Sequence, residues 1–429
     1  MKITAWKEAL TTGALDAQLT VLYGAEALDA QRDRWLAALD KFALLYGEDR
    51  QVSLFSVPGR SEVSGNHTDH NHGRVLCASV DLDCIAVAAR REDGVISIHS
   101  EGFSTDTVVL DQIAVSEDRF YTSHAIIEGV VDGFRRRGFG VGGYDAYTTS
   151  NVFKGSGLSS SAAYEVLVGK MLSYFWCDDA VDAPTLAKVG QYAENVFFGK
   201  PCGLMDQMAC AVGGLVTIDF ADPAEPVVEK MAFDLAEAGY RLCIVNTGGN
   251  HADLNEDYAS VPAEMKAVAQ QLGGKVLREI SYEAFLAKLP MLRTQVGDRA
   301  VLRALHFFGE NERVAKQVAA LRAEDLNTFL SLVIESGRSS YMRLQNVYTV
   351  KNVAEQGLSL ALCMAEEALS ALPAAWRVHG GGFAGTIQAF VPQAEASAFA
   401  KKMDAIFGEG ATKELRVRPI GATHLSEIN

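Results

Sequence analysis

The sequence predicts a protein of two domains that mixes helices with strands, and three observations support this. Its 429 residues exceed the roughly 100–200 that one domain usually holds. Strand patterns gather before residue 110, whereas helical patterns dominate residues 262–372. The pattern resets after Gly214, so we place the domain boundary there and expect domains at 1–214 and 215–429.

The first part of the chain predicts helices followed by strands. Residues 1–50 are predicted to be helical, with Trp35, Leu39, Phe42 and Leu45 on one face, and Gly47 ends the pattern. A short strand at 55–57 leads into the polar stretch 59–73, which we expect to be a loop. Strands at 85–88 and 95–98 flank Asp93-Gly94 and predict a hairpin.

The rest of the chain alternates between the two kinds of element. A helix is expected at 126–134, a strand at 144–149, a helix beginning within the serine run 159–161, and an amphipathic helix at 186–197. Strands are then predicted at 215–220, 240–246, 376–379 and 386–391. The glycines at 380–385 predict a hairpin tip that packs against a neighbouring loop.

Composition excludes several classes of protein. The chain carries 39 basic and 54 acidic residues, a net charge of −15, and its only basic run is Arg135-Arg136-Arg137, which argues against a nucleic-acid partner. No apolar run approaches the ~20 residues of a membrane span, and we expect no membrane partner. Seven cysteines without a C-x-x-C pair indicate free thiols, so we expect a cytoplasmic protein.

The stretch Lys154–Ala163 carries the strongest local signal. Gly155 and Gly157 allow a tight turn, and three serines follow at the expected start of a helix. Free N–H groups and partial positive charge at a helix N-terminus suit an anion, most plausibly phosphate, although a serine-capped helix remains the alternative. The chain contains no GxxxxGK[ST]. The G-x-G-x-x-G patterns at 138 and 380 lead into strands, which argues against a dinucleotide fingerprint.

Two further stretches place polar groups where chemistry is possible. The segment 59–73 packs Arg, Glu, His, Asp and Asn between glycines, and it is either functional or merely solvated. Its three histidines give only a weak indication of a metal site. Glu194 lies at the margin of an apolar stripe. Asp206, between Met205 and Met208 with Gln207, must be paired, ligated or catalytic unless it caps a helix.

Four motifs in register resemble the galactokinase branch of the GHMP small-molecule kinases. They are 58–69 (Pro-Gly-Arg through Gly-Asn-His-Thr-Asp), the loop 155–163, the segment 203–207 (Gly-Leu-Met-Asp-Gln) and the glycine motif 380–385. The spacing agrees over about residues 20–425. The resemblance implies a two-domain α+β architecture with the active site in the cleft between domains. It also implies ATP, Mg²⁺ and phosphoryl transfer to the anomeric hydroxyl of galactose, in a monomer or weak homo-oligomer.

The resemblance also assigns roles to individual residues. Asp206 would face the sugar hydroxyl as base or electrostatic partner, with Arg60 beside it and beside the transferring phosphoryl group. Ser161 and Glu194 would hold Mg²⁺. The remaining expected ligands are Asn66, His67, Asp69, Gly203 and Tyr258 for the sugar, and Gly155, Gly157, Leu158, Ser159, Ser160, Ser161 and Ala162 for the phosphates of ATP.

The chain departs from that family at several positions. Asn66 stands where galactokinases usually have the Glu that binds the 6-position of the sugar, and His70 stands where they usually have Tyr. Ala384 replaces a glycine, a proline is missing before the loop, and the basic residues usual after Tyr258 are absent. Kinases for galacturonate, N-acetylgalactosamine or arabinose, and a catalytically silent sugar and ATP sensor, therefore remain alternatives.

Overall fold

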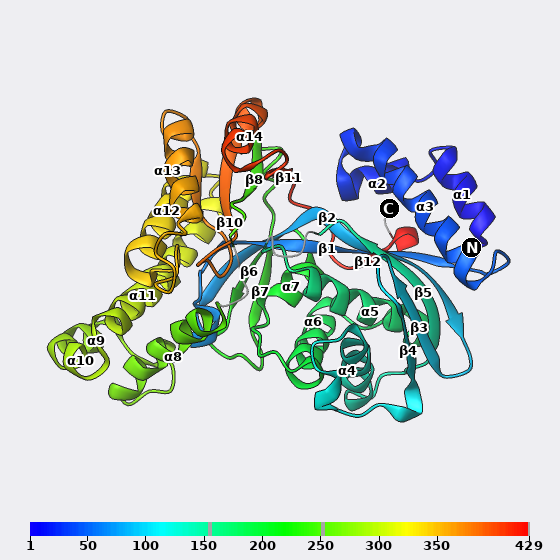
Figure 1. The fold of residues 1–429 in the computed structure, drawn as a ribbon, viewed down its shortest axis with the longest axis horizontal. Helices are drawn as coiled ribbons and strands as arrows, with labels where there is room; N and C mark the ends of the chain where they lie inside the picture. The colour runs from blue at the N-terminus through cyan, green and yellow to red at the C-terminus, as the bar shows by residue number, and fades with distance from the viewer. Residues whose placement is uncertain (153–156, 250–253, 428–429) are drawn as a thin grey trace.

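The computed structural model describes residues 1–152, 157–249 and 254–427, and within them two β-sheets are covered by helices (Figure 1). The larger sheet has the order β12-β1-β2-β5-β3-β4, and β6 pairs with both β2 and β7. Its strands are β1 (Ser53–Ser64), β2 (Arg74–Arg91), β3 (Val95–Ser100), β4 (Thr105–Val109), β5 (Gly143–Ser150), β6 (Leu215–Asp219), β7 (Val227–Met231) and β12 (Thr423–His424). The expected mixture of helices and strands is confirmed.

Helices cover both faces of the larger sheet, as Figure 1 shows. One face packs against α1 (Ile3–Thr11), α2 (Asp16–Tyr23) and α3 (Leu28–Tyr46), and the other against α4 (Ser123–Arg136), α5 (Ser160–Trp176), α6 (Ala183–Tyr192) and α7 (Met205–Val212). Trp35, Leu39 and Phe42 are fully buried against the sheet, but Leu45 is 42% exposed, so the predicted apolar face is one residue too long.

The smaller sheet follows the order β11-β8-β10-β9. Its strands are β8 (Tyr240–Asn246), β9 (Ala375–Val378), β10 (Thr386–Pro392) and β11 (Thr412–Leu415), and the helices after β8 are α8 (Asn255–Gln271), α9 (Tyr282–Ala287), α10 (Leu289–Val296), α11 (Asp298–Arg322), α12 (Leu326–Ser339), α13 (Gly357–Leu369) and α14 (Gln393–Phe407). In the described ranges no helix combines the length and apolarity needed to cross a membrane. The boundary at 214 stays a prediction, although β6, β7 and β12 pair within the larger sheet from beyond it.

The predicted hairpin at 85–98 is wrong, because β5 lies between its two strands. β5 pairs antiparallel with β2 and parallel with β3. A Cβ on Gly143, the first residue of β5, would come within 2.5 Å of the Val95 carbonyl oxygen. Because Gly143 has no side chain, β5 can lie between β2 and β3, which a two-residue turn would have placed side by side.

The first six residues of the predicted polar loop, 59–64, are instead the end of β1. Strand β1 runs to Ser64, and every residue from Leu54 onward is buried. Loop structure with the short 3₁₀ helix η2 (Asp69–Asn71) begins only at Gly65. A buried strand can carry Arg60 and Glu62 only because charged and amide groups from distant segments satisfy them.

Candidate active site

An ion pair between β1 and α7 forms the centre of the candidate site. Arg60 Nε donates to Asp206 Oδ1 at 2.7 Å, and Arg60 Nη2 lies 2.7 Å from Asp206 Oδ2. Arg60 is buried, whereas one third of the Asp206 side chain is exposed. The carboxylate in the apolar Met-Asp-Gln-Met segment is therefore paired, and it lies in the first turn of α7.

The surroundings of Asp206 favour the ionised carboxylate. Burial works to raise its pKa, but the charge of Arg60 and hydrogen bonds from Arg60 and Ser159 outweigh that effect and lower the pKa below its usual range. The pKa of Arg60 is raised, although burial opposes this, because Asp206 faces it. The pair is thus a fixed cation beside a fixed anion.

Ser159 links this pair to the start of α5. Its hydroxyl donates to Asp206 Oδ2, and its side chain makes no capping hydrogen bond to α5. Ser159 also has a left-handed backbone, with φ of 56°. Because the hydroxyl points to Asp206, the first N–H groups of α5 remain available to an anion.

The other predicted phosphate ligands surround that helix start. Ser160, Ser161 and Ala162 form the first turn of α5, and the Ser161 side chain is exposed. Leu158 is buried and accepts a hydrogen bond from the Arg60 N–H through its carbonyl oxygen. Gly155 lies outside the described residues.

Gly157 is held between Arg60 and the glycine motif 380–385. Its carbonyl oxygen accepts a hydrogen bond from Arg60 Nη1, and a Cβ at this position would lie 3.0 Å from His379 Nδ1. β9 and β10 form the predicted hairpin, and Gly380 at its tip lies against Gly157. The expected packing of this tip on a neighbouring loop is confirmed.

Glu194 lies on the π-helical segment η5 (Ala193–Phe198), buried and hydrogen-bonded. Its carboxylate accepts from Lys200 Nζ at 2.8 Å and from Gln207 Nε2 at 3.0 Å. The same Gln207 nitrogen donates to Glu165, whose pKa burial and the charge of Glu194 raise well above the usual range. No contact between Glu194 and Ser161 is seen within the described ranges.

The donor chemistry here suits Mg²⁺, which takes oxygen ligands and needs few of them from protein. Glu194 offers a carboxylate, Ser161 an exposed hydroxyl, and the buried Gln207 Oε1 has no hydrogen-bond partner within the described residues. Nowhere in the described chain, at Glu194 or at the histidines 67, 70 and 72, do three His, Cys, Asp or Glu side chains gather as a metal site.

Four of the predicted sugar ligands lie around the glycine hairpin and η2. His67 Nε2 is 2.9 Å from the Gly381 carbonyl oxygen, and the Tyr258 hydroxyl donates to Gly382 at 3.0 Å. A Cβ on Gly203 would come within 2.2 Å of Asp69 Oδ2, so only glycine lets that segment approach Asp69 so closely. Burial lowers the pKa of His67 to about 4, so the ring is neutral.

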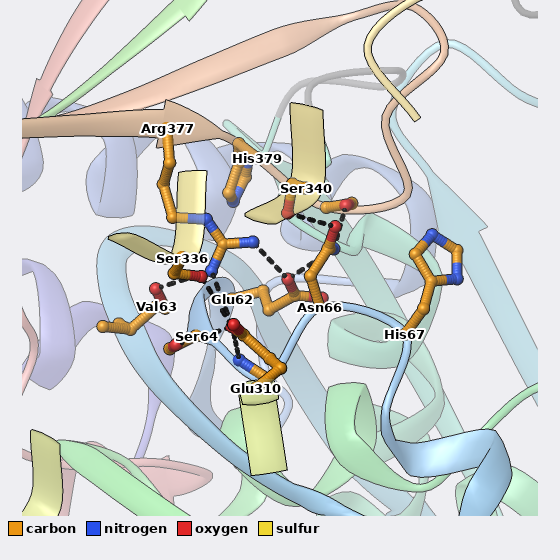
Figure 2. A network of polar contacts seen from close by, with 12 residues as sticks. Glu62, Val63, Ser64, Asn66, His67, Glu310, Ser336, Ser340, Arg377 and His379 are labelled. Carbon is orange, nitrogen blue, oxygen red and sulfur yellow. Dashed lines mark hydrogen bonds and ion pairs between the residues drawn. The ribbon is translucent and has the colours of Figure 1, made fainter. Parts of the chain in front are cut away.

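The fifth, Asn66, is fully buried in a polar network that Figure 2 shows. Its amide nitrogen donates to Glu62 Oε1 and to the Gly380 carbonyl, each at 2.7 Å. Its amide oxygen accepts from Asn346 at 2.7 Å and from Ser340 at 3.3 Å. Each hydrogen-bonding position of the amide is therefore occupied by protein.

Sequence reasoning missed the charged partners in this network. Arg377 of β9 reaches Glu62 and the Val63 carbonyl, and Glu310 of α11 accepts from the Gly65 N–H at 3.0 Å. Alternation along β1 could have indicated Glu62, two residues after Arg60 on the same face, if the stretch had been interpreted as a strand. Arg377 and Glu310 carry no local signal, because only the fold brings them together.

Two family models match the chain. The GHMP kinase N-terminal domain matches residues 125–214, and the galactokinase galactose-binding signature matches residues 40–90. The chain is 31% identical to a galactokinase of Streptomyces coelicolor over 385 residues, which covers 88% of this chain and 94% of that protein. It is 30% identical to a galactokinase of Lactobacillus helveticus over 368 residues, covering 84% and 90%.

A solved galactokinase structure also matches this chain. A galactokinase of Lactococcus lactis complexed with galactose superposes with a TM-score of 0.76 at 26% identity, covering 91% of this chain and 99% of that one. A mevalonate kinase superposes with a TM-score of 0.60 at 13% identity, covering 85% and 98%, which shows shared fold alone. The resemblance found in the sequence motifs is confirmed.

Proposed function

The chain belongs to the galactokinase family of ATP-dependent sugar kinases, and from this membership we propose that it transfers the γ-phosphoryl group of ATP to the anomeric hydroxyl of galactose. The products are galactose 1-phosphate and ADP. The observation that carries the proposal is the Arg60–Asp206 ion pair, which Ser159 joins to the first turn of α5. Sugar hydroxyl and phosphates would meet at this point.

Asp206 and Arg60 have different roles in the proposed phosphoryl transfer. As the anomeric oxygen bonds to the γ-phosphorus and the bond to ADP breaks, the hydroxyl proton passes to the Asp206 carboxylate. A carboxylate with a lowered pKa is a weak base, so its larger contribution is to orient the hydroxyl and to accept the proton late. Arg60 compensates the negative charge on the phosphoryl oxygens and keeps Asp206 ionised.

The nucleotide side is formed by the start of α5. Gly157, Leu158, Ser159, Ser160, Ser161 and Ala162, with Gly155, are proposed to bind the phosphates of ATP. Ser161 and Glu194 would hold Mg²⁺, which when bound supplies charge neutralisation on the phosphate oxygens. Lys200, paired with Glu194, would have to release that carboxylate to the metal.

The sugar side is proposed to consist of His67, Asp69, Gly203 and Tyr258. These residues lie on both sides of the glycine hairpin tip, within reach of the segment that carries Asp206. Asn66 has its amide positions filled by protein, so it contributes through its neighbours. Because Asn66 differs from the family's Glu, kinases for galacturonate, N-acetylgalactosamine or arabinose are the second candidates.

The setting of the reaction is also proposed. All seven cysteines are free, which fits a reducing cytoplasm. The net charge of −15 disfavours nucleic acid as a partner. A monomer or weak homo-oligomer would suffice, because the residues named above come from one chain.

The experiment is ADP release from ATP and Mg²⁺ with galactose, galacturonate, N-acetylgalactosamine and arabinose in parallel. A reaction without sugar measures background ATP hydrolysis. We expect galactose to give the highest kcat/KM. Much faster turnover of galacturonate would overturn the choice of sugar and leave a sugar kinase, whereas ADP release no greater than background with every sugar would contradict kinase activity.

A further inference from the structure

We propose that Glu62 is the carboxylate that binds the 6-hydroxyl of the sugar, and that Asn66 is a positioning residue that aims it. This inference rests on the proposed function and deepens it, because it names a specificity-determining residue that the sequence motifs did not reveal. It is carried by the contacts of Glu62 and Asn66 in the network of Figure 2.

Asn66 has no capacity left for a sugar. A side-chain amide offers two N–H donors and one oxygen with two acceptor positions. Glu62 and Gly380 take the two donors, and Asn346 and Ser340 take the acceptor. The side chain is also fully buried, so a hydroxyl could bind it only by breaking one of these hydrogen bonds.

Only one of the two carboxylate oxygens of Glu62 accepts hydrogen bonds from the described residues. Its Oε1 accepts from Asn66 Nδ2 at 2.7 Å and from Arg377 Nη2 at 3.3 Å. Its Oε2 accepts no hydrogen bond from any described residue. The Glu62 side chain is 7% exposed, and Oε2 is not among the buried polar atoms that lack a partner, so this oxygen keeps some access to solvent. A carboxylate with one oxygen fixed and the other unoccupied can accept a hydrogen bond from a ligand.

The position of Glu62 is next to the proposed reaction centre. β1 pairs with β2 in continuous register from Arg60 to Glu62, so these two side chains share one face of the strand. Arg60 faces Asp206, where the anomeric hydroxyl is expected. Glu62 also contacts Asn66, which precedes the predicted sugar ligand His67, so its carboxylate lies near the residues expected at the sugar.

The arrangement explains the departure at position 66. Relatives that carry Glu there hold a carboxylate at 66, whereas this chain holds one at 62 and hydrogen-bonds it to the amide of residue 66. The negative charge is thus displaced along the chain. Arg377 compensates it, and Asn66 fixes its orientation. A neutral 6-hydroxyl donates to this carboxylate, whereas a 6-carboxylate on the sugar would be repelled.

The test compares galactose with 6-deoxygalactose, which lacks only the hydroxyl in question. Assays run at pH 8, above the value of about 7 to which burial raises the pKa of Glu62. In the unmodified protein we expect kcat/KM for galactose to exceed that for 6-deoxygalactose by roughly tenfold or more, since a hydrogen bond to a charged acceptor is strong. Glu62→Gln should collapse this preference, chiefly by raising the KM for galactose.

Glu310→Gln is the matched control. Glu310 is a second buried carboxylate of the same network and also lies 3.9 Å from Arg377, but its hydrogen bonds come from Ser64, Gly65, Ser336 and Arg313 rather than from Asn66. Its loss should change both sugars alike and keep their ratio. A preference retained in Glu62→Gln, or a loss equal for the two sugars, would overturn the inference while phosphorylation of galactose by the unmodified protein would still support the proposed function.

A double-mutant cycle tests whether Asn66 acts through Glu62 or contacts the sugar itself. If Asn66 acts only through Glu62, then Asn66→Ala weakens the preference, and the variant with both changes discriminates no less than Glu62→Gln alone. If the reductions in sugar preference of the two single variants multiply in the double variant, Asn66 contacts the sugar itself, and the inference is wrong. Thermal unfolding checks folding. Asn66→Asp, which has the same size but lacks the donors to Glu62 and Gly380, replaces Asn66→Ala should that variant not fold.

Discussion

Asp206 shows how one residue combines two requirements that usually conflict. Its carboxylate contacts Arg60 and Ser159, which favour the ionised form, and one third of the side chain is still exposed. A fully buried ion pair could not reach a ligand, and a fully exposed pair would hold its two side chains together only weakly. The intermediate position suits a group that must touch a substrate.

Asp206→Asn should lower kcat by about 10²–10⁴-fold with little change in folding. The amide keeps the shape of the carboxylate but cannot accept the hydroxyl proton or hold the charge of Arg60. Steady-state kinetics with saturating galactose measures this. Asp219→Asn, which alters an ion pair with Arg74 and Arg278 away from the site, is the matched control and should leave kcat unchanged. Near-normal turnover by Asp206→Asn would remove it from the catalytic set.

Among single residues, the sequence predicted the contact between Arg60 and Asp206 but not the buried polar network of Glu62, Glu310 and Arg377. Asp206 stood out because a charge among apolar residues needs a partner, and the motif indicated Arg60. Glu62, Glu310 and Arg377 could not be found in that way. Their functions depend on contacts across 246 to 315 positions of sequence, which no local pattern encodes.

The elements around the site depend on close backbone approach. The glycine hairpin between β9 and β10 lies on Gly157 just before α5, and Gly157 has a positive φ of 72°. A side chain there would be strained and would push against His379. The start of α5 is thus held by backbone contacts as well as by Ser159.

Gly157→Val should raise the KM for ATP by roughly tenfold and leave the KM for galactose little changed. The strained backbone would shift the first turn of α5, whereas the sugar side is built on other segments. Titration of both substrates checks this. Gly94→Val is the control for strain alone, because Gly94 also has a positive φ, of 68°, but nothing lies within 4 Å of its Cβ position. Equal losses for ATP and galactose in Gly157→Val would point to general unfolding.

Helices and strands were predicted correctly where a local sequence pattern determines them. The prediction failed where the structure depends on pairing between strands that are far apart in the sequence. The helix that starts in the serine run and the glycine hairpin were predicted from short signals, and both are observed. The hairpin predicted at 85–98 is wrong because alternation of apolar and polar residues indicates a strand but not which strand lies beside it. The strand between β2 and β3 is β5, which comes from more than 40 residues further along the chain. The strand at 59–64 was missed because its charges resemble a solvated loop.

On the scale of the whole molecule, buried charges join the two sheets. Arg377 from the smaller sheet bonds to Glu62 and Val63 on β1, while Glu310 from α11 binds Gly65 and Arg313. Burial alone would raise the pKa of Glu310, but His306, Arg313 and Arg377, with the Ser336 hydroxyl, lower it to about 2. The junction therefore depends on this carboxylate staying ionised.

Stability should consequently fall in acid. Glu310 binds a proton more weakly in the folded chain than in the unfolded chain, so its contribution is complete above about pH 4.5 and is lost as pH falls toward 2. The shift corresponds to about 3 kcal/mol. Urea unfolding between pH 6 and 3 should show a smaller loss in Glu310→Gln than in the unmodified protein. Parallel pH curves would contradict this role, whatever the absolute stability of the variant.

The short strand β12 has a consequence for how the chain is made. Thr423 and His424 pair with Ser56 and Phe55 at the edge of β1, and the nearby Arg418 is buried against Asp83. A ribosome delivers β1 long before β12, so this edge stays unpaired until β12 has been synthesised. Nascent chains halted just before Thr423 should therefore recruit chaperones and resist proteases poorly, and the larger sheet is complete only once β12 has emerged.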